Sequence, residues 1–313
     1  MLLLAGGIAV VARLVIERGA GVIWNDCRHA GPGVALVFLA PAIGQLLHAT
    51  GWRLLLPRVA RPSMLRAYRI FLSAQAGNEL GIGILGEPLK VTELSLEHRD
   101  AAIAAVVLDN ATAFASLIAF FASGVVLAGL SPMNATVART VVLGALVGVG
   151  VVVVFWGAVR GSSRVVAVTR HIAIGSAVAV LRRVATLPAV VRIRRAARSC
   201  QGAIVTRPLD VGGAFLLHYL GKLWIIAEFS LLLGLFSAGS LKTAALFGVA
   251  SAAGSAIGAP VPGQVGVVEA AILRAALLAG IGASSALSVA LVRRVRGCFW
   301  IVLGALFFPH HRS

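Results

Sequence analysis

Long apolar runs recur along this chain and restrict the folds that it can adopt. A helix of about 20 residues crosses the hydrocarbon core of a bilayer, and apolar runs of comparable length cover 1–16, 33–56, 101–130, 138–158, 209–236, 243–259, 264–282 and 284–308. Only 12% of the 313 residues are charged, whereas a soluble domain carries about a quarter. The sequence therefore predicts an all-α polytopic membrane protein with about six to eight transmembrane or re-entrant helices.

Some of these runs are weaker candidates for full spans, which leaves about six credible ones. The run 1–16 is short, and the segment "GAPVPGQVG" separates 243–259 from 264–282. The latter pair either spans the bilayer or enters it and returns to the same side. The topology is self-consistent if 70–86 also forms a re-entrant hairpin.

The formal charge of +17 comes mainly from arginines that follow apolar spans. One group lies in "WRLLLPRVARPSMLRAYR", and the other, with ten arginines and no acidic residue, covers 160–207. Lys and Arg beside membrane spans normally mark cytoplasmic loops, so we expect both groups on the cytoplasmic side and no contact with nucleic acid. The second group is predicted to be amphipathic and to lie on an anionic leaflet; a solvated helical hairpin is left open.

We therefore predict a single integral membrane domain, 1–313. It has a first half, 1–158, a basic cytoplasmic amphipathic segment, 159–207, and a second half, 208–313. The three cysteines are scattered without a CxxC pair or histidines at ligand spacing, so neither a metal site nor a disulfide framework is expected.

The stretch "GNELGIGILGEPLK" places acidic residues inside this apolar chain. It ends in a glycine-rich unit made of Gly83, Gly86 and Glu87, and six of the eleven acidic residues lie between Glu79 and Asp109. Irregular backbone at membrane depth is tolerated only where it is buried in protein or lines a wet cavity. The unit therefore predicts a broken, re-entrant segment.

A second unit of this kind lies in the other half, in "GAPVPGQVGVVEAAI". Pro262 and Gly263 are followed by Gly266 and then by the carboxylate of Glu269. Paired Gly/Pro-interrupted segments in the two halves of a transporter indicate a binding region near the membrane midplane, and a carboxylate at that depth normally faces a cavity or a partner. The two units predict a pseudo-repeat, although close packing between helices is a sufficient explanation for most of the glycines.

Basic partners for these carboxylates lie in other apolar runs. We expect Glu87 or Glu269 to pair with Arg294. Arg293 and Arg296 are expected to extend toward an interface, because long cationic side chains do so readily. Lys222 and Glu228 are six residues apart and are poorly placed to share a helix face.

Three segments resemble a known family. "GILGEPLKVTEL", "VPGQVGVVEAAI" and "ALSVALVRRVRGCFW" are similar to elements of the flippase-like membrane proteins related to the transmembrane domain of lysylphosphatidylglycerol synthase, and the resemblance covers nearly the whole chain. "WRLLLP", "VVLDNAT" and "ALVRRVRG" are most similar to a hopanoid-associated subgroup. The chain departs from the family pattern because the family's leucine-proline element before the first glycine unit is missing: "NELGIGILGE" contains no proline.

The resemblance implies translocation of a polar, aminoacylated or isoprenoid-type lipid between leaflets of a bacterial inner membrane. Its lipid partners would be an anionic or aminoacylated phospholipid, or a hopanoid or isoprenoid lipid; a homo-oligomer is left open. No cofactor is implied, and aminoacyl transfer is not expected because the soluble synthase domain is absent. The implied site residues, none of them catalytic or metal-binding, are Gly83, Gly86, Glu87, Lys90, Asp109, Pro262, Gly263, Gly266, Glu269 and Arg294.

Two other classes stay open. The chain lacks HExxH, GxSxG and GxxxxGK[ST] motifs, but paired carboxylates in the membrane also suit an acid/base step, so a membrane subunit or accessory protein of a lipid-modifying enzyme is the alternative. A scaffold that recruits partners through its basic segment is the third class. In a scaffold, replacing Glu87 and Glu269 by Gln would be silent.

Overall fold

The computed structural model describes residues 28, 31, 33–80, 86–94, 96–127, 200, 202–236, 239–258 and 261–308, and every regular element among them is a helix. The all-α prediction is confirmed for these residues. The predicted runs 1–16 and 138–158, most of the basic segment, and Gly83 lie outside the described part of the chain.

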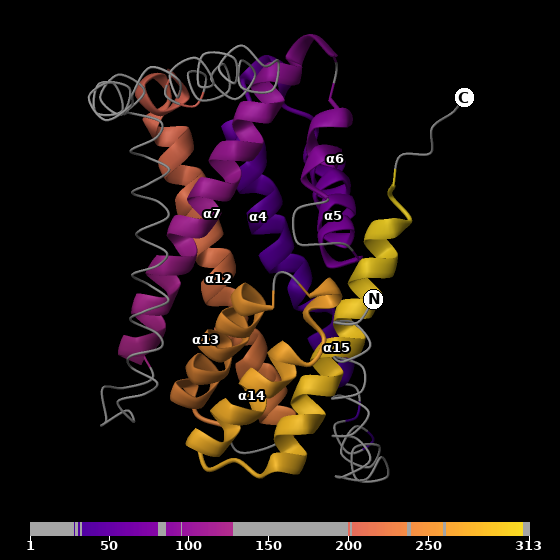
Figure 1. Cartoon of the computed structure of the whole chain (residues 1–313), viewed down its shortest axis with the longest axis vertical. Helices are drawn as coiled ribbons and strands as arrows, with labels where there is room; N and C mark the ends of the chain where they lie inside the picture. Colours follow the sequence, from indigo (N-terminus) through magenta and orange to yellow (C-terminus); the bar gives the residue numbers. More distant parts are fainter. Residues whose placement is uncertain are drawn as a thin grey trace, which may run out of the picture.

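The first half contains a long helix, a helical hairpin and another long helix (Figure 1). Its elements are α3 (Gly33–Leu39), α4 (Pro41–Leu55), η1 (Arg58–Ala60), α5 (Met64–Leu80), α6 (Glu87–Thr92), η2 (Leu96–His98) and α7 (Arg99–Leu127). Pro41 suits the first position of α4, because its fixed φ is helical and its missing N–H is not needed there. α4 ends at Leu55 because Leu56, the residue before Pro57, is extended.

The second half repeats this order of elements. They are α12 (Pro208–Phe236), α13 (Leu241–Ile257), η3 (Pro262–Gln264), α14 (Val267–Leu278) and α15 (Ala283–Ala305). Ser240 caps α13 by accepting a hydrogen bond of 3.2 Å from the backbone N–H of Thr243.

Three described helices are long and apolar enough to cross a membrane by length and composition. They are Ala35–Leu55, Arg99–Gly124 and Pro208–Phe236, and α13 is a shorter apolar helix. α15 has 23 residues but carries three arginines. The chain is thus a multi-pass membrane protein, with fewer uninterrupted spans among the described residues than the apolar runs predict.

α4 and α12 pack side by side and run in opposite directions. Near the start of α4, Gly44 faces Trp224, whereas near its end Leu54 faces Gly213 on the preceding part of α12. α5 and α15 are antiparallel as well, since Gly304 lies against Leu72 and Phe307, just beyond α15, lies near the earlier Arg69. The two halves of the chain therefore contact each other along their long helices.

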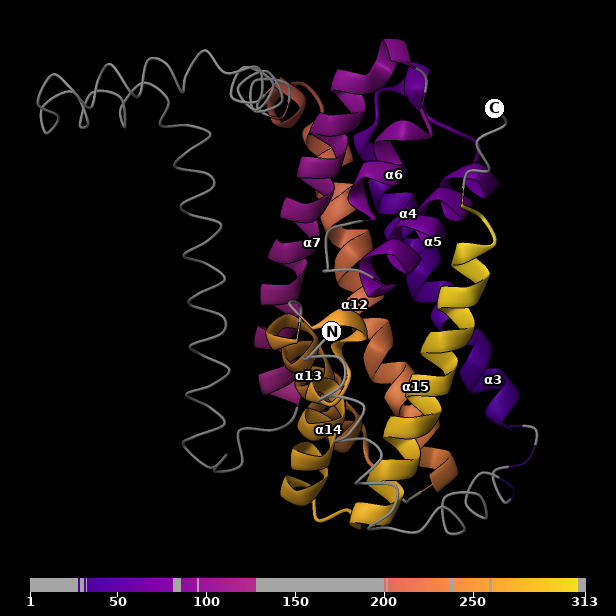
Figure 2. The same ribbon diagram turned by 45° about the vertical axis from the view of Figure 1, so that its right-hand side comes forward.

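The two hairpins lie toward opposite ends of this bundle (Figures 1 and 2). α5 and α6 approach at Gly77 and Gly86, and α13 and α14 approach at Gly254 and Val268. α7 and α15 each run from the hairpin end of their own half toward the other end of the molecule. The order of long helix, hairpin and long helix is thus repeated with the opposite direction.

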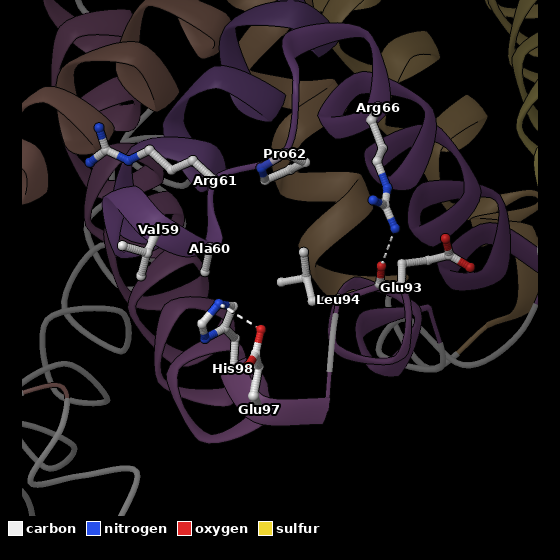
Figure 3. A pocket seen from close by; sticks show the side chains of 9 residues that line it. All are labelled: Val59, Ala60, Arg61, Pro62, Arg66, Glu93, Leu94, Glu97 and His98. Carbon is white, nitrogen blue, oxygen red and sulfur yellow. Dashed lines mark hydrogen bonds and ion pairs between the residues drawn. The ribbon is translucent and has the colours of Figure 1, made fainter.

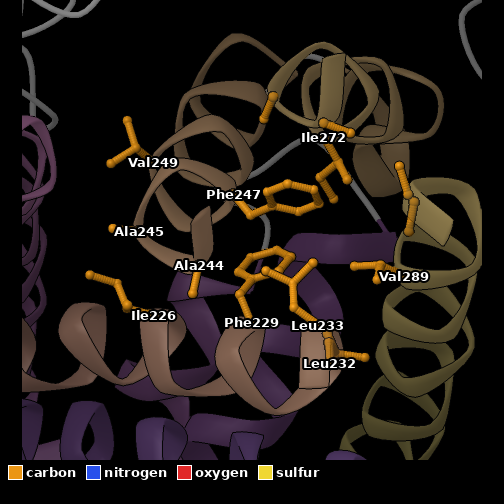
Figure 4. Packing of buried hydrophobic residues seen from close by; sticks show 14 of the residues in the cluster. Ile226, Phe229, Leu232, Leu233, Ala244, Ala245, Phe247, Val249, Ile272 and Val289 are labelled. Atoms are coloured by element: carbon orange, nitrogen blue, oxygen red, sulfur yellow. The ribbon is translucent and has the colours of Figure 1, made fainter. Parts of the chain in front are cut away.

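An apolar core holds the second half together. Phe229 of α12 and Phe247 of α13 meet edge to face, with ring centroids 5.8 Å apart, and Ile272 of α14 and Val289 of α15 lie around them (Figure 4). These four side chains are at most 1% exposed. The core fixes the positions of the helices on which the polar groups described below are mounted.

Candidate functional site

The first helix break is held closed by Gly86 and Asn78. A Cβ atom at Gly86 would lie 1.7 Å from the carbonyl oxygen of Ala74, so only glycine fits there. Asn78 accepts a hydrogen bond of 2.8 Å from the Gly86 N–H and donates one of 3.0 Å to Oε1 of Glu87. Asn78 therefore ties the end of α5 to the start of α6 and orients the Glu87 carboxylate.

Lys90 lies between two carboxylates. Its Nζ is 3.0 Å from Oε2 of Glu87, one turn earlier in α6, and 2.8 Å from Oδ2 of Asp109 in α7. Asn110 donates a further bond of 3.3 Å to Glu87. Lys90 and Asp109 are only 4% and 3% exposed, so this is a buried ion-pair cluster that joins three predicted site residues.

Two histidines extend the cluster into the contact between α4 and α12. His218 Nε2 is 2.8 Å from Oδ1 of Asp109, and His218 Nδ1 is 2.7 Å from Nδ1 of His48. The His48 ring also stacks on the Phe71 ring, and the Lys90 ammonium lies 5.3 Å from the centroid of the Phe71 ring. A continuous chain of polar contacts thus links α4, α12, α7 and α6.

Glycines opposite each histidine make this contact possible. A Cβ at Gly51 would lie 3.1 Å from Nε2 of His218, and a Cβ at Gly221 would lie 2.8 Å from Nε2 of His48. The pattern His-x-x-Gly occurs in both antiparallel helices, so each histidine packs onto the glycine of the other helix. Larger residues at either position would separate the two rings.

The second helix break is built on left-handed backbone. Gly263, Gln264 and Gly266 have φ values of 63°, 54° and 84°, a region in which glycine is strongly preferred. Glu269, in the first turn of α14, accepts a hydrogen bond of 2.8 Å from the Gly266 N–H. The carboxylate therefore stabilises the N-terminus of α14, where negative charge is favoured.

Arg294 of α15 locks this break. Its Nε donates to Oε1 of Glu269 at 2.7 Å, its Nη2 donates to the same oxygen, and its Nη1 donates to the carbonyl oxygen of Gly263. The predicted pair of Glu269 and Arg294 is confirmed, whereas Glu87 pairs with Lys90. The carbonyl oxygen of Glu79, near the end of α5, lies 3.8 Å from where a Cβ of Gly263 would be, so the two breaks adjoin.

Arg296 does not extend toward an interface, and that expectation is wrong. It forms an ion pair of 2.7 Å with Glu228 of α12, and both residues are 7% exposed. Because Glu228 supplies a counterion, Arg296 stays inside the bundle. Glu228 does not pair with Lys222, which agrees with the prediction from their spacing.

Lys222 and Arg293 differ from these paired cations. Among the described residues, neither has a side-chain hydrogen bond or ion pair. Arg293 lies within electrostatic range of Glu228 and Glu269, and Lys222 lies within range of His48. Both side chains are half-buried and, within the described part of the chain, have no anionic partner at hydrogen-bonding distance.

The sequence did not point to His48, His218, Asn78 or Asn110. The available signal was the repeated His-x-x-Gly pattern in two apolar runs, which places a polar ring one turn from a glycine. Pro262 lies in η3, and its side chain is outside the described residues. The candidate site thus comprises eight predicted residues with described backbone and side chain, and the histidines and asparagines complete the contacts around the first break.

A surface cavity and a buried cysteine lie apart from this site. A cavity of about 440 Å³ between η1 and the segment after α6 is lined by nine residues, among them Arg61, Arg66 and His98, and by no predicted site residue (Figure 3). Burial raises the pKa of the Cys200 thiol to about 11, so this cysteine is protonated and inert at neutral pH.

These features define a class: a polytopic helical membrane protein with charged residues buried at two adjoining helix breaks. A family model described as the lysylphosphatidylglycerol synthase TM region matches residues 1–305. The chain therefore belongs to this family. No curated protein and no solved structure matches it.

Proposed function

We propose that the protein translocates a polar lipid between the two leaflets of a membrane. The observation that carries the proposal is the pair of charged clusters at the helix breaks. In the first half, Lys90 of the short helix pairs with Asp109 of the next long helix; in the second, Glu269 pairs with Arg294 in the same way. Ionisable groups at membrane depth are costly and normally mark a transport path.

The clusters give a headgroup successive partners while the acyl chains stay in the bilayer. Lys222 and Arg293 are the side chains best placed to contact a phosphate, because the donors of Arg294 are already directed at Glu269 and the η3 backbone. Glu87, the more exposed of the two carboxylates around Lys90, suits a cationic or hydroxyl part of the headgroup. This favours an anionic or aminoacylated phospholipid as the substrate over a lipid without phosphate, and the resemblance to the hopanoid-associated subgroup stays a prediction.

The proposal assigns each hairpin to one leaflet. The α5–α6 hairpin would enter from the side of the basic segments, which we place in the cytoplasm of a bacterial inner membrane, and the α13–α14 hairpin from the other side. Non-helical backbone would then meet near the midplane, where the breaks adjoin. No catalytic step and no cofactor is assigned to the chain.

Leaflet exchange in proteoliposomes tests this function. Fluorescent lipids with cationic, zwitterionic and anionic headgroups report exchange through quenching by a reductant that cannot cross the membrane. We expect Glu87→Gln and Glu269→Gln to lower the rate about 5- to 30-fold, since each loses an ion pair or cap worth on the order of 1–2 kcal/mol in the transition state.

Glu93→Gln is the matched control, because Glu93 is a glutamate of the same region whose backbone carbonyl, not its carboxylate, contacts Arg66. It should exchange lipid at the wild-type rate. Folded wild-type protein without exchange above that of empty vesicles for every headgroup would contradict the proposal. That result would favour a membrane subunit of a lipid-modifying enzyme.

A further inference from the structure

The contact between the buried His218 and the half-buried His48 does not fit a role in packing alone. His218 is 1% exposed, yet both of its ring nitrogens have polar partners, one a carboxylate and the other a second histidine. A buried apolar side chain of similar size would fill the same space without the cost of burying polar groups. The geometry therefore calls for an explanation in terms of protons.

The contact distances fix where the protons are. Asp109 is ionised, because it pairs with Lys90, and so accepts a hydrogen bond from the N–H at Nε2 of His218. A separation of 2.7 Å between the Nδ1 atoms of His48 and His218 requires one proton between them. In the neutral pair that proton is on His48, and Nε2 of His48 is bare.

One more proton fits without breaking any of these contacts. A proton from water binds the lone pair of His48 Nε2, and the shared proton moves from His48 Nδ1 to His218 Nδ1. His48 is then neutral with its hydrogen on Nε2, and His218 is an imidazolium beside the Asp109 carboxylate. Each hydrogen bond keeps one proton throughout, and the positive charge ends next to an anion.

The surrounding charges act in both directions. Burial of His48 and the cations Lys222 of α12 and Lys90 of α6 oppose the added proton, and Asp109 of α7 favours it. Glu87 of α6 partly offsets Lys90, and α5 contributes the uncharged ring of Phe71 to this side of His48. An anion bound at Lys222 would remove one of the two opposing charges.

We propose that His48 and His218, beside the Asp109 carboxylate and the Lys90–Glu87 pair, form a site that takes up one proton at His48 Nε2 and releases it from the same atom when the step runs in reverse. Given the proposed lipid translocation, on which this coupling rests, the site links that translocation to a proton gradient. Binding of an anionic headgroup at Lys222 and protonation of the histidine pair then favour each other, as linked equilibria must.

The proton site is tested without any lipid transport. Nitrogen-15 ring spectra of the histidines in nanodiscs, recorded from about pH 5 to pH 8, should show two rings that titrate together, take up one proton between them and share an N–H···N coupling. His48→Gln and His218→Gln should each abolish that shared signal, whereas His98→Gln, which removes a histidine that pairs with Glu97 outside this cluster, should leave it unchanged. Two wild-type rings that stay neutral or titrate independently would overturn the proposal, whether or not the variants fold.

The coupling is tested in proteoliposomes with an imposed pH gradient. Wild-type exchange of an anionic lipid should change at least about threefold with the gradient, a change that corresponds to about 0.6 kcal/mol. His48→Gln should exchange lipid at the same rate with and without the gradient, and His98→Gln should respond like the wild type. If wild-type exchange does not change with the gradient, the coupling is refuted but lipid translocation is not. If there is no exchange at all, translocation is refuted, and the ring spectra alone test the proton site.

Discussion

Lys90 shows how a cation is kept inside an apolar bundle. It is buried between Glu87 and Asp109 and lies near the face of Phe71. The attraction to two carboxylates offsets the loss of hydration, which a single surface ion pair would not do. Removing the lysine would leave the buried carboxylate of Asp109 and the half-buried carboxylate of Glu87 without their shared cation.

We therefore expect Lys90→Met to destabilise the protein by about 3–5 kcal/mol. Unfolding in mixed micelles measures the change. The double variant Lys90→Met with Asp109→Leu should be less destabilised than Lys90→Met alone, because it removes one of the uncompensated charges. Lys242→Met, at an exposed position of α13, should have little effect, and equal losses for Lys90→Met and Lys242→Met would contradict the pairing seen in the structure.

At the scale of elements, hydropathy predicted the long helices well and the hairpins poorly. The run 101–130 became α7, Arg99–Leu127, and 209–236 became α12, Pro208–Phe236, because length and apolar content decide such helices. The predicted re-entrant segment 70–86 begins inside a longer helix, α5. Its polar residues include Asn78, whose partners lie across the break and so leave no periodic signal in the sequence.

The same distinction applies to the site. The pair of Glu269 and Arg294 was predictable from two isolated charges in apolar runs that need a partner. The partner of Lys90 was not, since the carboxylate of Asp109 is one of several acids nearby in the sequence. Contacts between His48 and His218, 170 residues apart, depend on how α4 and α12 cross, which no local pattern specifies.

The η3 turn offers a contrast between neighbouring residues in similar backbone conformations. Gly263 and Gln264 both have positive φ, where a side chain costs about 1–2 kcal/mol. Gly263→Ala should therefore destabilise the protein by about that amount and weaken the hydrogen bond from Arg294 to the turn. Gln264→Gly should be neutral or stabilising in the same unfolding assay. If Gly263→Ala were neutral and Gln264→Gly destabilising, side-chain contacts and not backbone conformation would determine this turn.

Seen as a whole molecule, the protein has two halves with opposite direction and exchanged charge. The short helix after the break carries a lysine in the first half and a glutamate in the second, and the following long helix carries the complementary charge. The halves thus match in architecture and in the position of an ion pair but not in residue identity. Because the halves share few residues, glycines and isolated charges were enough to indicate a repeat, but the sequence did not show that the second half runs in the opposite direction.

An inverted arrangement predicts which loops share a side of the membrane. In a cysteine-free background, Ser63→Cys before α5 and Thr92→Cys at the end of α6 should react with an impermeant thiol reagent from the same side. Ser240→Cys before α13 and Ser284→Cys at the start of α15 should react only from the opposite side. The four positions lie at the outer ends of the two hairpins, where the chain is at least partly exposed. Reaction of Ser63→Cys and Thr92→Cys from different sides would mean that the α5–α6 hairpin crosses the bilayer, and the two breaks would then not face each other near its midplane.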